Sequence, residues 1–252
     1  MSYCFIIPCY NHSTTLQATL TGLQPYHLPI VVIDDGSAAE HGVRIRQVCD
    51  GFNNVELLTK TVNAGKGAAV ISAIQLASQR GYSHALQVDA DGQHNLDDIP
   101  RLIERSRAHP EALVSGQPLY DSSVPKARLY GRYATHVWVW IETLSLTIPD
   151  SMCGFRVYPL AAFVTLSNKV RIGRRMDFDT EVMVRLYWQG TPVLFIPTRV
   201  IYPEGGTSNF RVWRDNLMIS WMHTRLFFGM LVRLPMLLGR KLRPAAALQK
   251  RP

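Results

Sequence analysis

An α/β fold with a mostly parallel sheet is predicted by two features of the sequence. Short apolar runs alternate with helix-length segments through the first half, and polar loops follow the apolar runs. The expected strands are 3–7, 30–33, 55–58 and 85–88. Ligands of such sheets collect beyond the carboxyl ends of the strands, so these loops are the expected place for chemistry.

The segments between the strands have apolar residues at helical spacing. Ser13 or Thr14 can cap a helix that runs to about Leu23. Further helices are expected at 43–48, 68–77, 96–106, 130–144 and 178–189. The second half is less regular, and its loops, including the Gly-containing loop 150–156, should complete the site.

Composition allows one substantial core, since 47% of the 252 residues are apolar. The net charge is +8, and the basic excess collects toward the C-terminus, in Arg233, Arg240, Lys241, Arg243, Lys250 and Arg251. A basic end suits anionic lipid or phosphate-bearing ligands. No helix-turn-helix, zinc-finger or RNA-platform pattern is present, so no nucleic-acid partner is expected.

The four cysteines include no CxxC pair, and the chain enters its first strand without a basic region or a cleavage site. Reduced thiols and a cytoplasmic location are therefore expected. A metal site or disulfide from Cys4 and Cys9 is less favoured, because both flank a predicted buried strand.

The stretch 213–242 is rich in Leu, Met, Phe and Trp but is interrupted by charges, so no uncharged run reaches the ~18 residues of a spanning helix. An amphipathic helix in the membrane interface is expected, anchored by Trp213, Trp221, Phe227 and Phe228. The alternative is a helix packed on the domain or on a second subunit. The predicted organisation is a domain at 1–210 and a basic amphipathic segment at 211–252.

The sharpest motif follows the strand at 85–88 and reads Asp89-Ala90-Asp91-Gly92-Gln93-His94. Its carboxylate and amide oxygens suit Mg²⁺ or Mn²⁺, which would bridge the phosphates of a nucleotide. An EF-hand is excluded because His94 and Pro100 stand where Gly and Glu are required. An aspartyl phosphatase would carry such a pair after the first strand. A plain Asp-Gly turn that caps the next helix is the alternative.

Other strand ends carry comparable loops: Pro8-Cys9-Tyr10-Asn11, Asp34-Asp35-Gly36-Ser37 and Asn63-Ala64-Gly65-Lys66-Gly67. The ring, amide and carboxylates of the first two can hold a base or a ribose, and the third can offer N–H groups and a Lys to phosphate. Its spacing fits neither a P-loop nor the dinucleotide fingerprint, which disfavours a nicotinamide or flavin enzyme.

Together with Cys153-Gly154-Phe155-Arg156 and Gly206-x-Ser208, these motifs resemble, in order, the inverting family 2 glycosyltransferases. The resemblance covers about 3–210 and is nearest to the dolichyl- or polyprenyl-phosphate sugar synthases and their small bacterial cousins. It implies the nucleotide-sugar-binding α/β sandwich called GT-A.

The resemblance also implies roles. Asp89 would face the nucleotide and the sugar, Asp91 and Gln93 would hold the metal together with Asp89, and His12 departs from the usual acidic residue. The nucleoside pocket would be lined by Pro8, Tyr10, Asn11, Asp35 and Lys66.

On the acceptor side, Asp179 matches the base of hydroxyl-glycosylating relatives, and Asp150 is a second carboxylate that could orient the donor sugar. Asp179 could equally be a carboxylate favoured by a helix N-terminus. A polyprenyl phosphate needs no base, and its expected ligands are Arg132, Arg156, Ser208 and Arg211.

The expected function is a metal-dependent, inverting transfer of a hexose from a UDP- or GDP-sugar to a membrane-associated acceptor, most simply polyprenyl phosphate, at the cytoplasmic face. The alternatives are transfer to a hydroxyl with Asp179 as base, and a non-catalytic nucleotide-binding module at the membrane surface. A sugar nucleotidyltransferase is disfavoured because it should begin with a Gly-rich loop where Pro8-Cys9-Tyr10-Asn11 stands.

Overall fold

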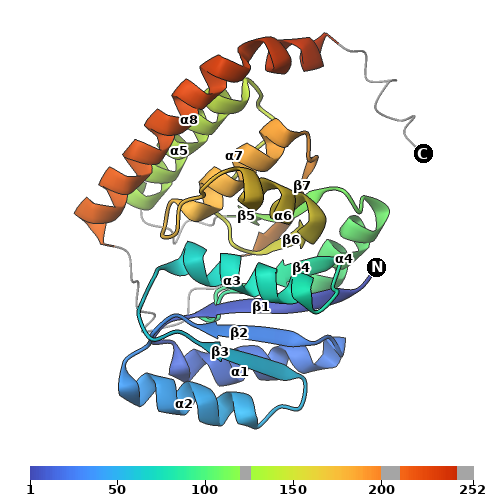
Figure 1. Ribbon diagram of the computed structural model, residues 1–252, viewed down its shortest axis with the longest axis vertical. Coiled ribbons are helices and arrows are strands. Elements are labelled where there is room, and N and C mark those ends of the chain that lie inside the picture. Colours follow the sequence, from blue (N-terminus) through green and yellow to red (C-terminus); the bar gives the residue numbers. More distant parts are fainter. Residues whose placement is uncertain (120–125, 200–210, 243–252) are drawn as a thin grey trace.

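The computed structural model describes residues 1–119, 126–199 and 211–242. Its centre is a seven-stranded sheet in the order β3-β2-β1-β4-β6-β5-β7 (Figure 1). Strand pairing is parallel except at β6, which runs antiparallel to β4 and β5. The strands are β1 (Tyr3–Cys9), β2 (Ile30–Asp34), β3 (Val55–Thr59), β4 (His84–Gln87), β5 (Leu113–Leu119), β6 (Arg156–Pro159) and β7 (Val193–Arg199).

Alternating side chains of the strands build one core on each face of this sheet. In β1, Cys4 and Ile6 enter the core beneath α3, α6 and α7, whereas Phe5 and Ile7 enter the core beneath α1, α2 and α4. The helices are α1 (Ser13–Leu23), α2 (Ala39–Asp50), α3 (Lys66–Gln79), α4 (Ile99–Ala108), α5 (Lys126–Thr143), α6 (Leu160–Lys169), α7 (Phe178–Gln189) and α8 (Val212–Lys241). The predicted layered α/β fold is confirmed.

The first half closely follows the pattern of the sequence. The four expected strands are present as β1 to β4, and the helices between them are α1, α2 and α3. Most elements extend a few residues beyond the expected bounds, whereas the fourth helix starts later: Leu96–Asp98 is a 3-10 turn, and α4 starts at Ile99. Pro100 explains the shift, because proline is favoured in the first turn of a helix, where its missing N–H is not needed.

The second half is more regular than the sequence suggests. Three strands, β5, β6 and β7, and the helix α6 were not predicted. Gly116 and Pro118 interrupt β5, and Pro197 interrupts β7, so neither shows an unbroken strand pattern. Strand β6 is four residues long, too short for alternation to be recognised.

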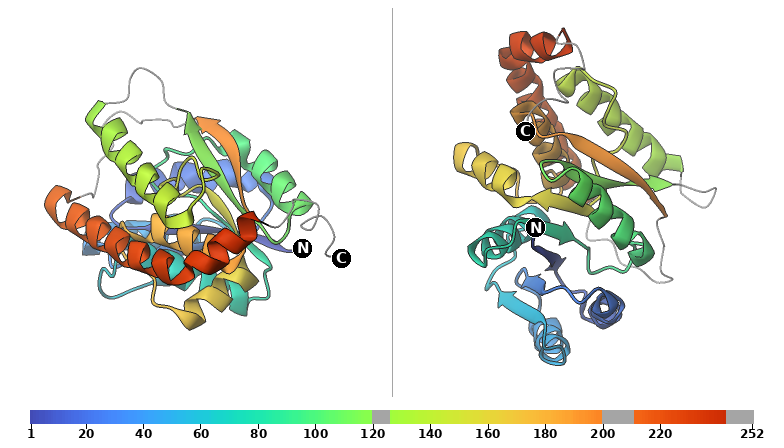
Figure 2. Two further views of the ribbon diagram at one scale, coloured as in Figure 1. Left: turned by 90° about the horizontal axis from the view of Figure 1, so that it is seen from above. Right: turned by 90° about the vertical axis from the view of Figure 1, so that its right-hand side faces the viewer.

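Helix α8 lies beside α5 and also contacts α7 (Figure 2). Its inner side is buried through Met222, Leu226 and Met230. Its outer side leaves Trp213 92% and Val232 81% exposed. Among the described helices, none is sufficiently long and apolar to cross a membrane.

The cysteines Cys4, Cys9, Cys49 and Cys153 are buried free thiols. Burial raises the pKa of each to about 12, so all four stay protonated near neutral pH. They are packing residues of the two cores rather than reactive groups.

Candidate active site

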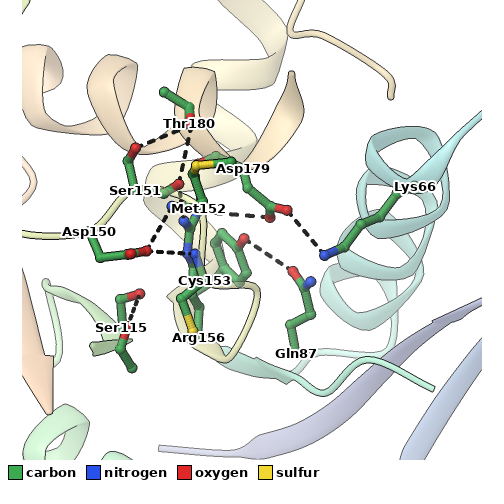
Figure 3. A network of polar contacts seen from close by, with 12 residues as sticks. Lys66, Gln87, Ser115, Asp150, Ser151, Met152, Cys153, Arg156, Asp179 and Thr180 are labelled. Atoms are coloured by element: carbon green, nitrogen blue, oxygen red, sulfur yellow. Dashed lines mark hydrogen bonds and ion pairs between the residues drawn. The ribbon is translucent and has the colours of Figure 1, made fainter. Parts of the chain in front are cut away.

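The candidate site lies at the carboxyl edge of the parallel strands, where the loops after β1, β2 and β4 meet the first turns of α3 and α7. Figure 3 shows Lys66 of α3 reaching across to Asp179 of α7. Lys66 Nζ lies 3.1 Å from Asp179 Oδ2 and 2.8 Å from Asp89 Oδ2. One ammonium therefore joins two carboxylates that are 90 positions apart in the sequence.

The charges of this bridge are fixed by mutual attraction. Burial alone would lower the pKa of Lys66, but Asp179 and Asp89 raise it well above its usual range. Burial would likewise raise the pKa of the Asp89 carboxyl, but Lys66 and His94 together hold it well below its usual range. The ammonium and the Asp89 carboxylate are thus both ionised at neutral pH.

Two further side chains form hydrogen bonds with Asp89, one with its carboxylate and one with its backbone N–H. Gln87 Nε2 donates to its Oδ1 at 2.9 Å, and the Asp89 N–H donates to His94 Nδ1 at 3.3 Å. The His94 ring stacks on Phe155 with centroids 4.8 Å apart. Gln87 and His94 were not assigned roles from the sequence, because neither residue type is diagnostic without knowledge of its neighbours.

Gly154 lets the chain pass directly over this bridge. A Cβ at this position would lie between 2.7 and 2.9 Å from Gln87 Nε2, Asp89 Oδ2 and Lys66 Nζ. Contacts that short would force these three side-chain ends to shift, so a side chain at this position would disturb the bridge. The segment Cys153-Gly154-Phe155 therefore packs directly against the side chains that form the bridge.

Asp91 and Gln93 lie in the open turn that follows β4. Gly92 has a φ of 73°, and Asp91 Oδ1 accepts the Gln93 N–H at 3.0 Å. Asp91 and Gln93 are both partly exposed, so oxygen donors on this turn face solvent. Within the described ranges no three His, Cys, Asp or Glu side chains cluster closely enough to hold a metal by themselves.

The expected nucleoside residues gather at the same edge through β1 and β2. Asn11 adopts a left-handed φ of 58°, and its Oδ1 accepts the Ala38 N–H at 3.0 Å, which joins the loops after these two strands. Pro8 is buried at the end of β1, and Tyr10 follows it, partly exposed.

Asp35, which was expected to line the nucleoside pocket, has a buried carboxylate that already has two partners. Its side chain is 2% exposed, its Oδ1 lies 3.1 Å from Lys60 Nζ, and its Oδ2 accepts the Gly65 N–H at 2.6 Å. It therefore ties the loop after β2 to the start of α3. Contact with a nucleoside would require one of these partners to move.

Arg156 supports Asp179 from inside the protein. Its side chain is fully buried, Nη1 donates to the Asp179 carbonyl at 2.6 Å, and Nη2 donates to the Ser151 carbonyl at 2.6 Å. Nη1 also lies 3.9 Å from Asp179 Oδ1, which has no hydrogen-bond partner among the described residues. Burial would lower the pKa of Arg156, but Tyr158 and Asp179 raise it, so the guanidinium stays charged.

Asp150 forms a second, deeper cluster. Arg132 binds its carboxylate through Nε at 2.9 Å and Nη2 at 2.7 Å. The N–H groups of Met152 and Cys153 donate to Oδ1 (Figure 3). His136 Nε2 lies 3.3 Å from Oδ2. Burial works to raise the pKa of Asp150, but His136 and Arg132 lower it to about 2.

Two further residues, Arg211 and Ser208, were expected at the acceptor side. Arg211 is exposed immediately before α8, where its backbone N–H donates to Asp215 Oδ2 at 2.7 Å. Ser208 lies outside the described residues.

Residues 4–163 match the model of Glycosyl transferase family 2, which is more than half of the chain. The chain belongs to this family. It is 26% identical to undecaprenyl-phosphate mannosyltransferase of Micrococcus luteus, over 81% of this chain and 85% of that protein. It is 25% identical to UDP-N-acetylglucosamine–dolichyl-phosphate N-acetylglucosaminyltransferase of Methanococcus voltae, over 90% and 94%.

Solved structures show the same fold. Glucosyl-3-phosphoglycerate synthase of Mycobacterium tuberculosis matches with a TM-score of 0.65 and 12% identity, over 92% of this chain and 79% of that chain. Another crystal structure of that synthase contains Mn²⁺, UDP-glucose and phosphoglyceric acid. The protein is thus a family 2 glycosyltransferase with the GT-A fold, related to the dolichyl- and polyprenyl-phosphate sugar transferases.

Proposed function

We propose that this family 2 glycosyltransferase transfers a hexose from a UDP- or GDP-sugar to the phosphate of a membrane polyprenol, with inversion at the anomeric carbon. The observation that carries the proposal is the Lys66 bridge between Asp89 and Asp179, beside the open Asp91 turn. The bridge supplies one cation and two carboxylates where the diphosphate and the sugar of the donor would meet. The relatives that use undecaprenyl and dolichyl phosphate support the acceptor class.

The donor would lie across the carboxyl edge of β1, β2 and β4. The nucleoside pocket would be lined by Pro8, Tyr10, Asn11 and Asp35. The Asp35 carboxylate would give up its hydrogen bond with Lys60 or with the Gly65 N–H and bind the nucleoside in its place. Lys66 would offer its ammonium to the donor phosphates, because it already lies at the surface of the site with 22% of its side chain exposed. Asp89 would then face the donor sugar.

The residues present fit Mg²⁺ or Mn²⁺ only together with the donor. Asp91 and Gln93 offer partly exposed oxygens, which are the ligands that these ions prefer, and Asp89 adds a carboxylate that Lys66 now neutralises. Phosphate oxygens of the donor would complete the coordination. When bound, the ion would offset the charge that develops on the leaving diphosphate.

A phosphate acceptor is favoured because it is already anionic and attacks without losing a proton. The carboxylate of Asp179 is occupied by Lys66, so it is poorly placed to take a proton before the donor arrives. Arg132, which retains 16% exposure, and Arg211 are the proposed phosphate ligands, with Ser208 beyond the described residues. Arg156 is fully buried, so we assign it the positioning of Asp179. Asp150, enclosed by Arg132, His136 and backbone N–H groups, would position Arg132 rather than contact the sugar.

A hydroxyl acceptor is the second candidate, with Asp179 as general base. The observation in its favour is that Asp179 Oδ1 makes no hydrogen bond within the described residues and so retains capacity to accept one. This reaction requires Lys66 to turn toward the donor phosphates and release the carboxylate.

Membrane contact through α8 is part of the proposal. Its outer side exposes six apolar side chains, here named together the α8 outer face: Trp213, Leu217, Trp221, Phe228, Leu231 and Val232. Basic residues flank it, so an anionic bilayer is the complementary partner. We place the protein peripherally on the cytoplasmic face, where its buried thiols would stay reduced.

The test is turnover of purified protein with Mn²⁺, membrane lipid extract and a panel of UDP- and GDP-sugars. Nucleotide diphosphate release with labelled lipid is expected, and Asp91→Ala should lower turnover by about 10²- to 10³-fold. Asp97→Ala, on the exposed turn before α4, is the matched control and should keep full activity.

The alternatives give other results. Full activity of Asp91→Ala would contradict the proposed role of Asp91 as a metal ligand and, with it, the proposed metal dependence. Diphosphate release without labelled lipid, abolished by Asp179→Asn, would establish the hydroxyl acceptor. Absence of metal-dependent nucleotide binding in calorimetry would leave a non-catalytic membrane-surface module.

A further inference from the structure

A cavity of about 220 Å³ lies between α6, α7 and α8, away from the Lys66 bridge. Its charged lining is basic: Lys169 comes from the last turn of α6, Arg185 from α7 and Arg233 from α8, and Gln189 adds a neutral amide. No carboxylate is among the described residues that line it. Leu166, Val170 and Trp188 supply an apolar floor.

The carboxylate that pairs with Arg185 of this cavity is already neutralised. Glu181 is fully buried and receives Arg185 at 2.7 Å and Arg225 at 3.3 Å. Its single charge is therefore shared by two guanidinium groups. The neighbourhood retains a net positive charge that a bound anion would balance.

The floor and one cation of the cavity are held in place. The Trp188 indole N–H donates to the Glu142 carbonyl at 2.8 Å, and the Arg233 guanidinium lies 4.8 Å above the Trp188 ring. Gly229 allows this packing, because a Cβ there would lie 2.9 Å from the ring. Arg233 Nη1 also donates to the Gly229 carbonyl at 2.9 Å. Arg233 is thus preorganised, which reduces the entropy lost when it binds a ligand.

The cavity borders the α8 outer face. Arg233 directly follows Val232, which is 81% exposed, and Met236 on the next turn is 39% exposed. In an interfacial helix the headgroup phosphates lie at the level of the flanking cations while the apolar face enters the acyl region. A ligand with a phosphate joined to an apolar body fits both parts.

We propose that this cavity is a phosphate-binding site, occupied by the headgroup of an anionic phospholipid when the α8 outer face lies on a bilayer. The lipid part rests on the proposed membrane contact, whereas the phosphate part rests on the cavity alone. Helix α7 carries Asp179 in its first turn and Trp188 in its last, a separation of about 14 Å along the helix. Lipid bound there would fix the orientation of the catalytic edge relative to the membrane.

The experiment measures binding of the full chain to vesicles of phosphatidylcholine with and without phosphatidylglycerol. Lys169→Gln and Arg233→Gln should each weaken binding to the anionic vesicles about fivefold, and the double variant about 25-fold. Arg44→Gln with Arg46→Gln removes the same charge from exposed positions of α2, at the opposite end of the molecule from α8 (Figure 1), and should change little. Arg214→Gln, exposed on the first turn of α8 but outside the cavity, tests for general attraction.

Competition by inorganic phosphate identifies the source of the ligand. If inorganic phosphate displaces the protein from anionic vesicles only at concentrations far above that of the lipid, the headgroup is the ligand. If it displaces the protein at a concentration equal to that of the lipid, the site is assigned to free phosphate. Equal losses in Arg214→Gln and Arg233→Gln would overturn the site, as would equal binding to both kinds of vesicle. Donor-dependent diphosphate release by the double variant should match that of the wild type in detergent, which separates failure of this site from failure of the proposed function.

Discussion

Two clusters of charge in this protein are similar in composition but differ in what holds them. At the sheet edge, Lys66, Asp89 and Asp179 have side chains that are 22%, 18% and 10% exposed. Within the described part of the chain, the Lys66 ammonium is held by these two carboxylate side chains and by no backbone group. Beneath it, Asp150 is 3% exposed and is bound by Arg132 and by two backbone N–H groups. The first cluster can exchange partners with a ligand, whereas displacing Asp150 from the second would break two backbone hydrogen bonds of its loop.

The difference suggests that the Lys66 bridge binds ligand and that the Asp150 cluster stabilises the structure around it. Removing one partner from a buried ion pair leaves an uncompensated charge, so such a pair resists change and fixes geometry. A bridge open to solvent can release one carboxylate when a phosphate arrives to replace it. We therefore expect mutations in the first cluster to affect turnover and mutations in the second to affect stability.

The largest expected effect is on turnover, from Lys66→Met. Loss of the ammonium removes the proposed phosphate contact and leaves Asp89 and Asp179 without a shared cation, so kcat/KM should fall about 10³-fold, or about 4 kcal/mol. The free energy of unfolding should change by less than 1 kcal/mol, because the bridge is partly solvated. Steady-state kinetics and urea unfolding measure the two quantities.

Lys60→Met is the matched control for this substitution. Lys60 also pairs with an aspartate at 3.1 Å, but among the described residues Asp35 is its one carboxylate partner. Its removal should raise the KM for the donor less than tenfold and leave kcat unchanged. An equal fall in kcat for both variants would mean that the two-carboxylate bridge has no special role.

Sequence patterns predicted the first half of the fold because each strand of a parallel sheet there is a short apolar run bounded by polar loops. They also placed Asp89, Asp91 and Lys66 at one edge, since parallel strands bring their carboxyl ends together. They did not predict β6, whose antiparallel insertion brings Gly154 and Arg156 against that edge. A contact between distant segments leaves no periodic signal in either one.

The partners of the charged side chains could not be predicted from the sequence either. Arg132 and Arg156 were both expected to bind the acceptor, but the sequence did not reveal that Arg132 also binds Asp150 or that Arg156 is fully buried. Their charge suggested a ligand, whereas their location gives them internal carbonyl and carboxylate acceptors. Sequence gives the charge of a side chain but not its burial, and burial decides which partner it takes.

The next effect in size is the loss of stability in Asp150→Asn, which should lower the free energy of unfolding by about 3 kcal/mol near neutral pH. The folded pKa of about 2 lies below the unfolded value, so ionised Asp150 stabilises the fold above about pH 4, and this contribution is lost as the pH falls toward 2. Urea unfolding of both proteins from pH 7 to pH 2.5 should show the difference shrinking. A difference that stays constant over this range would mean that it comes from packing and not from charge.

The smallest effects come from a comparison of two pairs outside both clusters. Glu142 in α5 is fully buried and lies 2.7 Å from His223 Nδ1 of α8, whereas Glu56 pairs with Arg80 at an exposed position. Glu142→Ala should cost about 2 kcal/mol, because His223 is left buried without its acceptor. Glu56→Ala should cost at most about 0.5 kcal/mol, because solvent replaces the lost partner. Equal costs in urea unfolding would contradict the rule used to separate site from support: burial would then not decide which charges carry the fold, and the Lys66 bridge could be structural as well.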